Sequence, residues 1–119
     1  MATIIRIDLD ESKKYKNISV EEWIGLFRAR AKNVLERRGF KILSEALYIS
    51  ASGRGFHHEI LLKEDITQKQ KISLRIALFD DKKRIEIDKE RIRYGCAWKD
   101  ILFTSKTYDG KRSERVRVF

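Results

Sequence analysis

The chain has 119 residues, of which 42% are hydrophobic and 38% are charged, and its formal net charge is +9. This length predicts one domain over residues 1–119, and the hydrophobic content excludes an intrinsically disordered chain. A single cysteine, Cys96, excludes an intrachain disulfide and a multi-cysteine zinc site. The excess of 27 Lys and Arg over 18 Asp and Glu favours a polyanionic partner, most commonly nucleic acid.

Nothing in the sequence points to a membrane. No run of apolar residues is long enough to cross a bilayer, so we expect no membrane partner. The first residues, Met1 to Arg6, lack the charged and then apolar layout of a signal peptide. We therefore expect an intracellular protein.

A strand and a helix are predicted in the first forty residues. Residues 3–9 place apolar side chains at alternate positions and predict a strand, and the polar stretch 10–18 predicts a loop. A helix is expected to begin after Ser19, which forms a capping box with Glu22, and to end at Gly39. Its apolar stripe comprises Val20, Trp23, Ile24, Phe27, Ala31, Val34 and Leu35.

A β-hairpin is predicted next. Residues 42–51 are rich in apolar and aromatic side chains, and the turn signal Ser52-Gly53-Arg54-Gly55 separates them from a second strand. A four-residue turn sets a register with one apolar and one polar face. The apolar face comprises Leu47, Ile49, Ala51, Phe56, His58, Ile60 and Leu62, and the polar face comprises Tyr48, Ser50, His57 and Glu59. We expect the apolar face to meet the helix and the polar face to be open.

The second half of the chain reads mainly as strands. Residues 71–79 alternate cleanly, and residues 84–88 return as a strand after a turn. Residues 89–98 are ambiguous between helix and coil. Residues 101–103 resemble a final core strand, and residues 115–119 alternate like an edge strand. This order predicts an α+β fold, with a mainly antiparallel sheet of about five strands and flanking helices.

Gly55-Phe56-His57-His58-Glu59 opens the second hairpin strand and contains both histidines of the chain. Because side chains alternate along a strand, His57 and Glu59 point to one face and His58 to the other. A neutral imidazole and an ionised carboxylate in this arrangement can hold Mg²⁺ or Mn²⁺ and leave positions open for substrate oxygens. The alternative is a surface pair without a metal. His58, on the apolar face, fits a hydrogen-bonded core residue.

Tyr108 lies in a cationic segment, close to Lys106, Lys111 and Arg112. A tyrosine is a weak nucleophile because its pKa is about 10. Nearby cations favour the phenolate, and a metal ion on a phosphate makes the phosphorus easier to attack. These features predict metal-assisted chemistry on a phosphodiester. The alternative is an ordinary turn tyrosine, since Asp109-Gly110 is a strong hairpin signal.

The strand from Gly55 to Leu61, followed late in the chain by Tyr108 and Lys111, resembles the small replication initiators, called Rep, of the HUH endonuclease superfamily. The length, basic balance and composition are most similar to the Rep proteins of rod-shaped archaeal viruses (rudiviruses). The resemblance implies a five-stranded antiparallel sheet with flanking helices, a relative of the ferredoxin-like fold. For a viral protein it also implies the host cytoplasm.

The activity that this resemblance implies is a metal-dependent, site-specific single-strand DNA endonuclease and ligase. The tyrosine forms a 5′-phosphotyrosine intermediate and frees a 3′-hydroxyl that primes synthesis. The substrate would be single-stranded DNA at a replication origin or genome terminus, and a homodimer would supply two nucleophiles. The residues implied are Tyr108 as nucleophile, His57 with Glu59 or His58 as ligands of Mg²⁺ or Mn²⁺, and Lys111 or Lys106 as the cation near the phosphate.

Two other functions stay open from the sequence. A non-enzymatic DNA-binding protein would use the same charge on phosphates, with an affinity that falls steeply as salt rises. A primase-like nucleotidyl transferase would combine a histidine on a strand with nearby carboxylates, for which Asp80, Asp81 and Asp88 are available. The chain is short for that fold.

Overall fold

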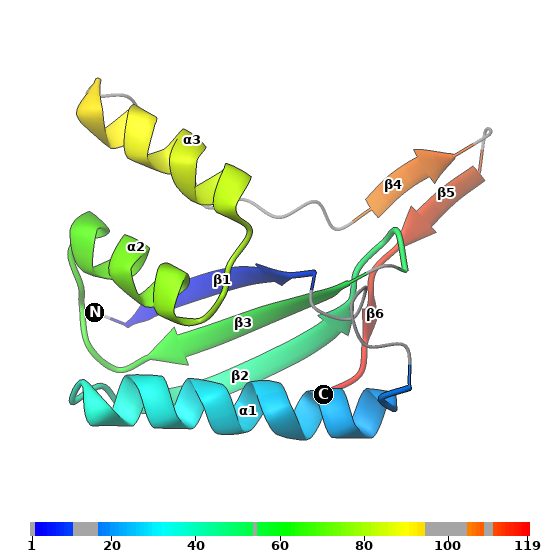
Figure 1. Ribbon diagram of the computed structural model, residues 1–119, viewed down its shortest axis with the longest axis horizontal. Coiled ribbons are helices and arrows are strands. Elements are labelled where there is room, and N and C mark those ends of the chain that lie inside the picture. The colour runs from blue at the N-terminus through cyan, green and yellow to red at the C-terminus, as the bar shows by residue number, and fades with distance from the viewer. Residues whose placement is uncertain (1, 11–16, 54, 95–104, 109–110) are drawn as a thin grey trace.

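The computed structural model describes residues 2–10, 17–53, 55–94, 105–108 and 111–119, and it describes side chains in the last two segments only from residue 114. The helices are α1 (Val20–Arg37), α2 (Gln68–Ala77) and α3 (Lys82–Arg93). The strands are β1 (Thr3–Leu9), β2 (Ile42–Ile49), β3 (Phe56–Leu62), β4 (Ser105–Tyr108), β5 (Lys111–Glu114) and β6 (Val116–Arg117). Figure 1 shows their arrangement.

An antiparallel sheet forms the centre of the molecule. Its four strands lie in the order β1-β3-β2-β6, and β4 and β5 form a separate antiparallel ribbon. The prediction of an α+β fold on an antiparallel sheet is confirmed, although the sheet has four strands where about five were expected. Within the described residues, no helix combines the length and the apolar character needed to cross a membrane.

The first strand and the first helix form where the sequence predicts them. The Ser19 hydroxyl accepts a hydrogen bond from the backbone N–H of Glu22 at 3.2 Å, which satisfies one free donor at the start of α1. At the other end, Gly39 adopts a φ of 83°, and the backbone N–H of Phe40 bonds to the carbonyl of Leu35 at 3.0 Å. This is the glycine-terminated helix end that the sequence indicated.

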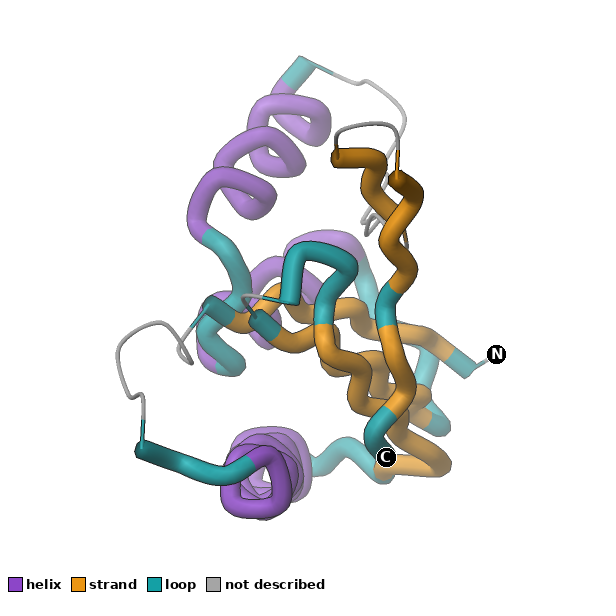
Figure 2. Tube along the Cα trace, turned by 90° about the vertical axis from the view of Figure 1, so that its right-hand side faces the viewer, coloured by secondary structure: helices purple, strands orange, loops and turns teal. Residues whose placement is uncertain are grey.

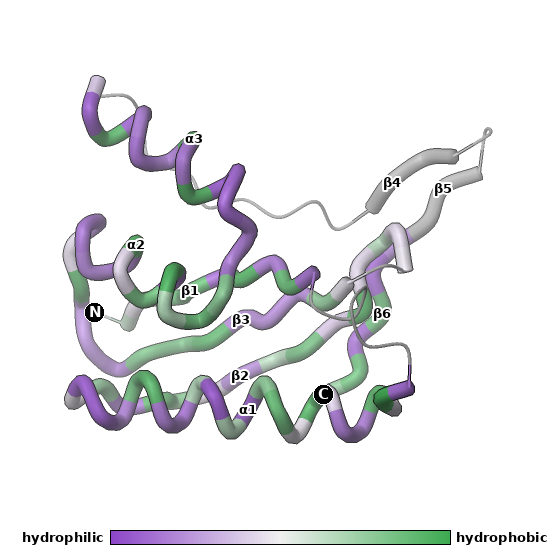
Figure 3. Tube along the Cα trace, in the orientation of Figure 1, coloured by the Kyte–Doolittle hydropathy of each residue, from purple (hydrophilic) through white to green (hydrophobic). Residues whose placement is uncertain are grey.

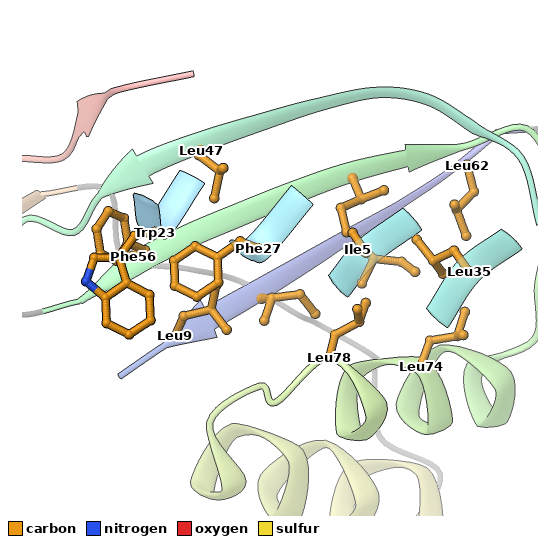
Figure 4. Packing of buried hydrophobic residues seen from close by; sticks show 13 residues of the cluster. Ile5, Leu9, Trp23, Phe27, Leu35, Leu47, Phe56, Leu62, Leu74 and Leu78 are labelled. Atoms are coloured by element: carbon orange, nitrogen blue, oxygen red, sulfur yellow. The ribbon is translucent and has the colours of Figure 1, made fainter. Parts of the chain in front are cut away.

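The hydrophobic core lies between one face of the sheet and the two helices α1 and α2 (Figures 2 and 4). Aromatic rings fill the end of the core nearest the start of α1. Trp23 stacks on Phe27 with ring centroids 5.2 Å apart, and Phe27 meets Phe56 edge-on at 5.3 Å. Apolar residues of β1 and α2 complete the cluster, which includes Ile5, Ile7, Leu9, Leu74 and Leu78.

The β2–β3 hairpin has the predicted faces but not the predicted register, because a turn over residues 52–55 would pair Ala51 with Phe56, whereas the partner of Phe56 is Ile49. Tyr48 lies opposite His57, and Leu47 lies opposite His58. Because directly opposed residues of an antiparallel pair share a face, the two histidines lie on opposite faces of the sheet. The face with Leu47 and His58 packs on α1, as expected.

The strand predicted over residues 71–79 is wrong, because residues 71–77 lie in α2 and Leu78 is its C-cap. Thr67 and Gln70 form a complete capping box at the start of the helix. Apolar residues at 72, 74, 76 and 78 fit an alternating pattern, but of these it is Leu74 and Leu78, four residues apart, that share the helical face packed on the core. Ile76, which alternation would bury, is 50% exposed.

The strand predicted over residues 84–88 is also wrong. The segment lies in α3, whose N-cap Asp81 accepts a hydrogen bond from the backbone N–H of Lys83 at 3.1 Å. The helix turns Ile85 and Asp88 inward and leaves Ile87 54% exposed. It continues to Arg93, which settles residues 89–93 as helix. Figure 3 shows how hydrophilic α3 is, which explains why its pattern was misleading.

The final segments have different outcomes. The edge strand predicted over residues 115–119 is confirmed in part, since Val116 and Arg117 pair with β2. The core strand predicted over residues 101–103 and the segment 94–98 beyond Tyr94 lie outside the described residues.

A buried ion network joins the two helices that the sequence pattern missed. The guanidinium of Arg75, which is 0% exposed, donates to Asp80 at 2.6 Å and to Asp88 at 2.7 Å. Asp88 lies on α3 and Arg75 on α2, so this link fixes the angle between the helices. Removing one partner of such a buried pair leaves an uncompensated charge in the interior, which is strongly destabilising.

The same network covers the free edge of β1. Asp80 accepts a hydrogen bond from the backbone N–H of Asp8 at 2.8 Å, and Arg84 donates to the backbone carbonyl of Arg6 at 3.3 Å. Arg84 is also ion-paired with Asp80 at 2.6 Å. An edge strand whose backbone groups are satisfied in this way is a poor template for pairing with another chain.

Candidate functional site

His58 belongs to the core side of the sheet. It lies opposite Ile7 and Leu47 and is 3% exposed. Its Nε2 lies 2.9 Å from Oε2 of Glu45, whose other oxygen accepts from Arg28 of α1 at 2.8 Å. Burial alone would raise the pKa of Glu45, but these two partners outweigh it and hold the pKa below its usual value. His58 is therefore part of a buried polar link between the sheet and α1.

His57 lies on the other face, between two neighbouring strands. Its cross-strand neighbours are Asp8 on β1 and Tyr48 on β2. Nε2 of His57 lies 3.8 Å from Oδ1 of Asp8. We expected this face to be open, but His57 is only 4% exposed, while the Asp8 side chain is 26% exposed.

Glu59 shares the face of His57 but has other partners. Its Oε1 accepts a hydrogen bond from Arg115 at 2.9 Å, and its Oε2 lies 3.5 Å from Nε of Arg6. The Arg115 guanidinium also lies over the ring of Tyr48, 3.7 Å from its centroid. The carboxylate that the structure brings to His57 is therefore that of Asp8, and Glu59 neutralises two arginines.

Asp8 was missed in the sequence, although its position on β1 carries a signal. The side chains at positions 5, 7 and 9 are buried in the core, so Asp8 must point to the opposite face. The sequence pattern of β1 does not show which strand pairs with it. The pairing of β1 with β3, which aligns Asp8 with His57, joins residues about 50 positions apart.

The Asp8 carboxyl has a strongly perturbed pKa. Burial raises the pKa of Asp8 to about 6, the charges of Asp10, Asp81 and Asp80 add to the rise, and Arg84 opposes it. The carboxylate therefore lacks enough positive charge around it in the protein alone. A cation bound beside it would relieve this and displace its proton.

We expect Asp8→Asn to stabilise the protein at neutral pH. The folded state binds the Asp8 proton more tightly than the unfolded chain does, so the free energy of unfolding falls as the pH rises from the ordinary pKa of 3.8 to about 6. The variant should be more stable than the wild type at pH 7.5 by up to about 3 kcal/mol, and equally stable near pH 4.

Thermal melts at both pH values, without divalent ions, measure this difference. Asp65→Asn, at an exposed aspartate, is the matched control and should change neither value. A variant that is less stable than the wild type at pH 7.5 would show that the Asp8 carboxylate supports the fold.

The donor set at this site fits a hard divalent cation only in part. Among the described residues, no group of three or more His, Cys, Asp or Glu side chains is arranged to hold a metal ion. His57 and Asp8 supply one nitrogen and one carboxylate, which are ligand types that Mg²⁺ and Mn²⁺ accept, and these ions commonly take water and phosphate oxygens as further ligands. Asp80 and Asp88, considered for a primase-like site, are engaged by Arg75.

Tyr108 is placed by its backbone on a strand. It is the last residue of β4 and pairs with Lys111 on β5, while Lys106 lies two residues earlier on β4. The ribbon rises from the end of the sheet that holds the β2–β3 turn (Figures 1 and 2). Its base continues into Arg115, which contacts Glu59. Four residues of β5 span about 13 Å, so the tip of the ribbon is well separated from Arg115.

The structure thus brings Asp8 and His57 together, with Glu59 and Arg115 beside them on the same face. It places Tyr108, Lys106 and Lys111 on a ribbon attached to that end of the sheet; their side chains lie outside the described residues. Comparisons with protein-family models, with curated proteins and with solved structures found no match for this chain.

Proposed function

We propose that this protein is a replication initiator of the HUH endonuclease superfamily, similar to the Rep proteins of rod-shaped archaeal viruses. It nicks and rejoins single-stranded DNA at an origin or genome terminus. One observation carries the proposal: an imidazole and a carboxylate with a raised pKa lie 3.8 Å apart on adjacent strands of an antiparallel sheet, in a chain of net charge +9. Strongly perturbed titratable groups of this kind are enriched at functional sites.

His57 and Asp8 would hold Mg²⁺ or Mn²⁺. When bound there, the ion supplies positive charge to the oxygens of the scissile phosphate. Asp8 is the group that makes this site pH-dependent, because its carboxyl must lose a proton with a pKa of about 6. Glu59 becomes a ligand in place of Asp8 only by giving up its two arginine partners.

Tyr108 would be the nucleophile, and Lys106 and Lys111 would favour its phenolate. The phenolate oxygen attacks phosphorus, the bond from phosphorus to the 3′ oxygen breaks, and the 3′ oxygen leaves as a hydroxyl after taking a proton. The reverse attack by a 3′-hydroxyl rejoins the strand and releases the tyrosine. With one such tyrosine per chain, a homodimer supplies the two nucleophiles that a nick followed by joining uses.

The test is to trap the covalent intermediate. We expect the protein, incubated with 5′-labelled and 3′-labelled single-stranded DNA carrying the viral terminus or origin and Mn²⁺, to form a complex that survives denaturation. Only the strand segment on the 3′ side of the nick should stay attached, because the linkage is to its 5′ phosphate. EDTA should abolish the complex without abolishing DNA binding.

A second candidate, a DNA-binding protein without catalysis, is favoured by the ribbon. A two-stranded antiparallel ribbon fits the major groove of duplex DNA, and this one contains Lys106, Lys111 and Arg112. This function predicts tight binding to duplex DNA, a steep loss of affinity with salt, and no covalent complex with or without Mn²⁺. That outcome would replace the nicking proposal.

A further inference from the structure

The ends of α1 and α2 have the same backbone geometry but different residues. Beyond α1, Gly39 has a φ of 83°; beyond α2, Phe79 has a φ of 61°. At both ends, the backbone N–H of the residue with positive φ donates to the carbonyl three residues before it. The N–H of the following residue donates to the carbonyl five residues before it. For α2 these bonds run from Phe79 to the Ile76 carbonyl at 3.1 Å and from Asp80 to the Arg75 carbonyl at 3.0 Å.

Phenylalanine is an unfavourable residue for this position. A bulky side chain at positive φ is strained, whereas glycine adopts that conformation freely. Burial does not compensate, because Phe79 is 61% exposed. The Arg30 guanidinium of α1 lies over the ring, 4.3 Å from its centroid. The fold would therefore accept glycine here, and we look for the reason for the aromatic ring in function and not in stability.

Phe79 lines a cleft of about 710 Å³ between α2, α3 and the end of β1, which we name the α2–α3 cleft. Ile76, Phe79 and Ile85 form its apolar part. Lys82, Lys83 and Lys89 line it from α3, and Asp8 and Asp10 line it from the β1 side. An apolar surface with an exposed aromatic ring, flanked by lysines, matches the chemistry of a nucleobase and its phosphate.

The carboxylates of the cleft decide when a phosphate is accepted. Asp80 is already neutralised by Arg75 and Arg84, and Glu86 is paired with Lys89 at 3.4 Å. Asp8 and Asp10 line the β1 end of the cleft, and Asp81, the N-cap of α3, is a third carboxylate there. A divalent ion at Asp8 would reduce the repulsion between these carboxylates and a phosphate, so a nucleotide should enter the cleft most readily when that ion is bound.

We infer that the α2–α3 cleft binds one nucleotide of the single-stranded DNA substrate beside the scissile phosphate, with its base against Phe79 and a phosphate at the lysines of α3. The inference rests on the proposed function, because Asp8 belongs to both the candidate metal site and the cleft. It adds a specific subsite that holds the strand next to the reacting bond.

The test uses Phe79→Gly in a Tyr108→Phe background, so that no strand is cut. The probe is a fluorescein-labelled single-stranded oligonucleotide of mixed sequence, titrated by anisotropy in Mn²⁺. We expect the dissociation constant to rise about 5- to 150-fold, the usual effect of removing a stacking aromatic. The melting temperature should stay equal or rise, because glycine relieves the strain. Phe79→Trp should restore the affinity.

Tyr94→Ala is the matched control. Tyr94 is 70% exposed and also lies near an arginine, with Arg93 5.7 Å from its ring centroid, but it does not line the α2–α3 cleft. It should bind the oligonucleotide as the parent does. Unchanged affinity in Phe79→Gly, or an equal loss in Tyr94→Ala, would overturn the inference. A large fall in melting temperature for Phe79→Gly would also overturn the inference, because it would show that the ring stabilises the fold.

The outcome is separable from that of the proposed function. If Phe79→Gly binds as the parent does while wild-type protein still forms the covalent complex, the subsite fails and the nicking activity stands. If Phe79→Gly loses a dimer in sedimentation but keeps its affinity for the oligonucleotide, the cleft is a contact between copies of the chain and the inference fails.

Discussion

Tyr108→Phe should abolish the covalent protein–DNA complex while leaving the affinity for the DNA strand close to that of the wild type. The substitution removes one oxygen and nothing else, so it deletes the nucleophile and keeps the ring and the backbone of β4. Losing the nucleophile of a covalent mechanism typically costs three or more orders of magnitude in rate, so we expect adduct formation to fall below about one thousandth of the wild-type rate.

The measurement is a time course of adduct on denaturing gels, with DNA binding followed in parallel by anisotropy. Tyr94→Phe, which removes the same atom from an exposed tyrosine outside the ribbon, is the control and should react like the wild type. If Tyr108→Phe still forms the adduct, another residue is the nucleophile and the assignment of Tyr108 ends. If it loses DNA binding to the same degree, the loss of adduct says nothing about chemistry and the ribbon is a binding element.

His57→Gln should weaken Mn²⁺ binding by at least about 100-fold and abolish metal-dependent cleavage. Loss of a residue that only supports a ligand commonly costs 10- to 100-fold in metal affinity, and loss of a direct ligand should cost at least as much. Glutamine is chosen because His57 is 4% exposed and a smaller residue would leave a cavity. Isothermal titration with Mn²⁺ at pH 7.5 gives the affinities.

A pair of carboxylate variants identifies the partner of His57. We expect Asp8→Asn to lose Mn²⁺ affinity as His57→Gln does, and Glu59→Gln to keep it, because Glu59 is engaged by Arg6 and Arg115. In the wild type the affinity should rise as the pH rises through about 6, because the ion displaces the proton of Asp8. If Glu59→Gln loses the ion and Asp8→Asn keeps it, the ligand pair is His57 with Glu59.

The elements predicted correctly are those whose signals lie close together in the chain. The Ser19 cap and the Gly39 stop bracket an apolar stripe in α1, and strand alternation on both sides of the β2–β3 turn assigns the two faces of the hairpin. The two strands predicted within residues 71–88 are wrong for the opposite reason, because the structure there depends on contacts between segments that are distant along the chain. Their apolar residues alternate as in a strand, and tertiary contacts override this pattern: α2 buries Leu74 and Leu78 on the core, and Arg75 anchors α3 through Asp88.

In the candidate site too, the features predicted from the sequence are local, and those that were missed depend on contacts between distant segments. Strand alternation alone separates His57 from His58, and the structure bears out their opposite faces. Asp8 and Arg115 enter only through the sheet, since β1 aligns Asp8 with His57 and the segment before β6 carries Arg115 to Glu59. No local pattern contains either contact, because each joins strands that are distant along the chain.

The sequence by itself determined the charge of this protein, its hairpin, its first helix and the face on which each histidine lies, because these follow from composition and from periods of two and 3.6 residues. The tertiary structure alone decided which carboxylate meets His57, which arginines engage Glu59 and where Phe79 stands. Those outcomes depend on strand order and helix packing, which are set by how the whole core closes and not by any one segment.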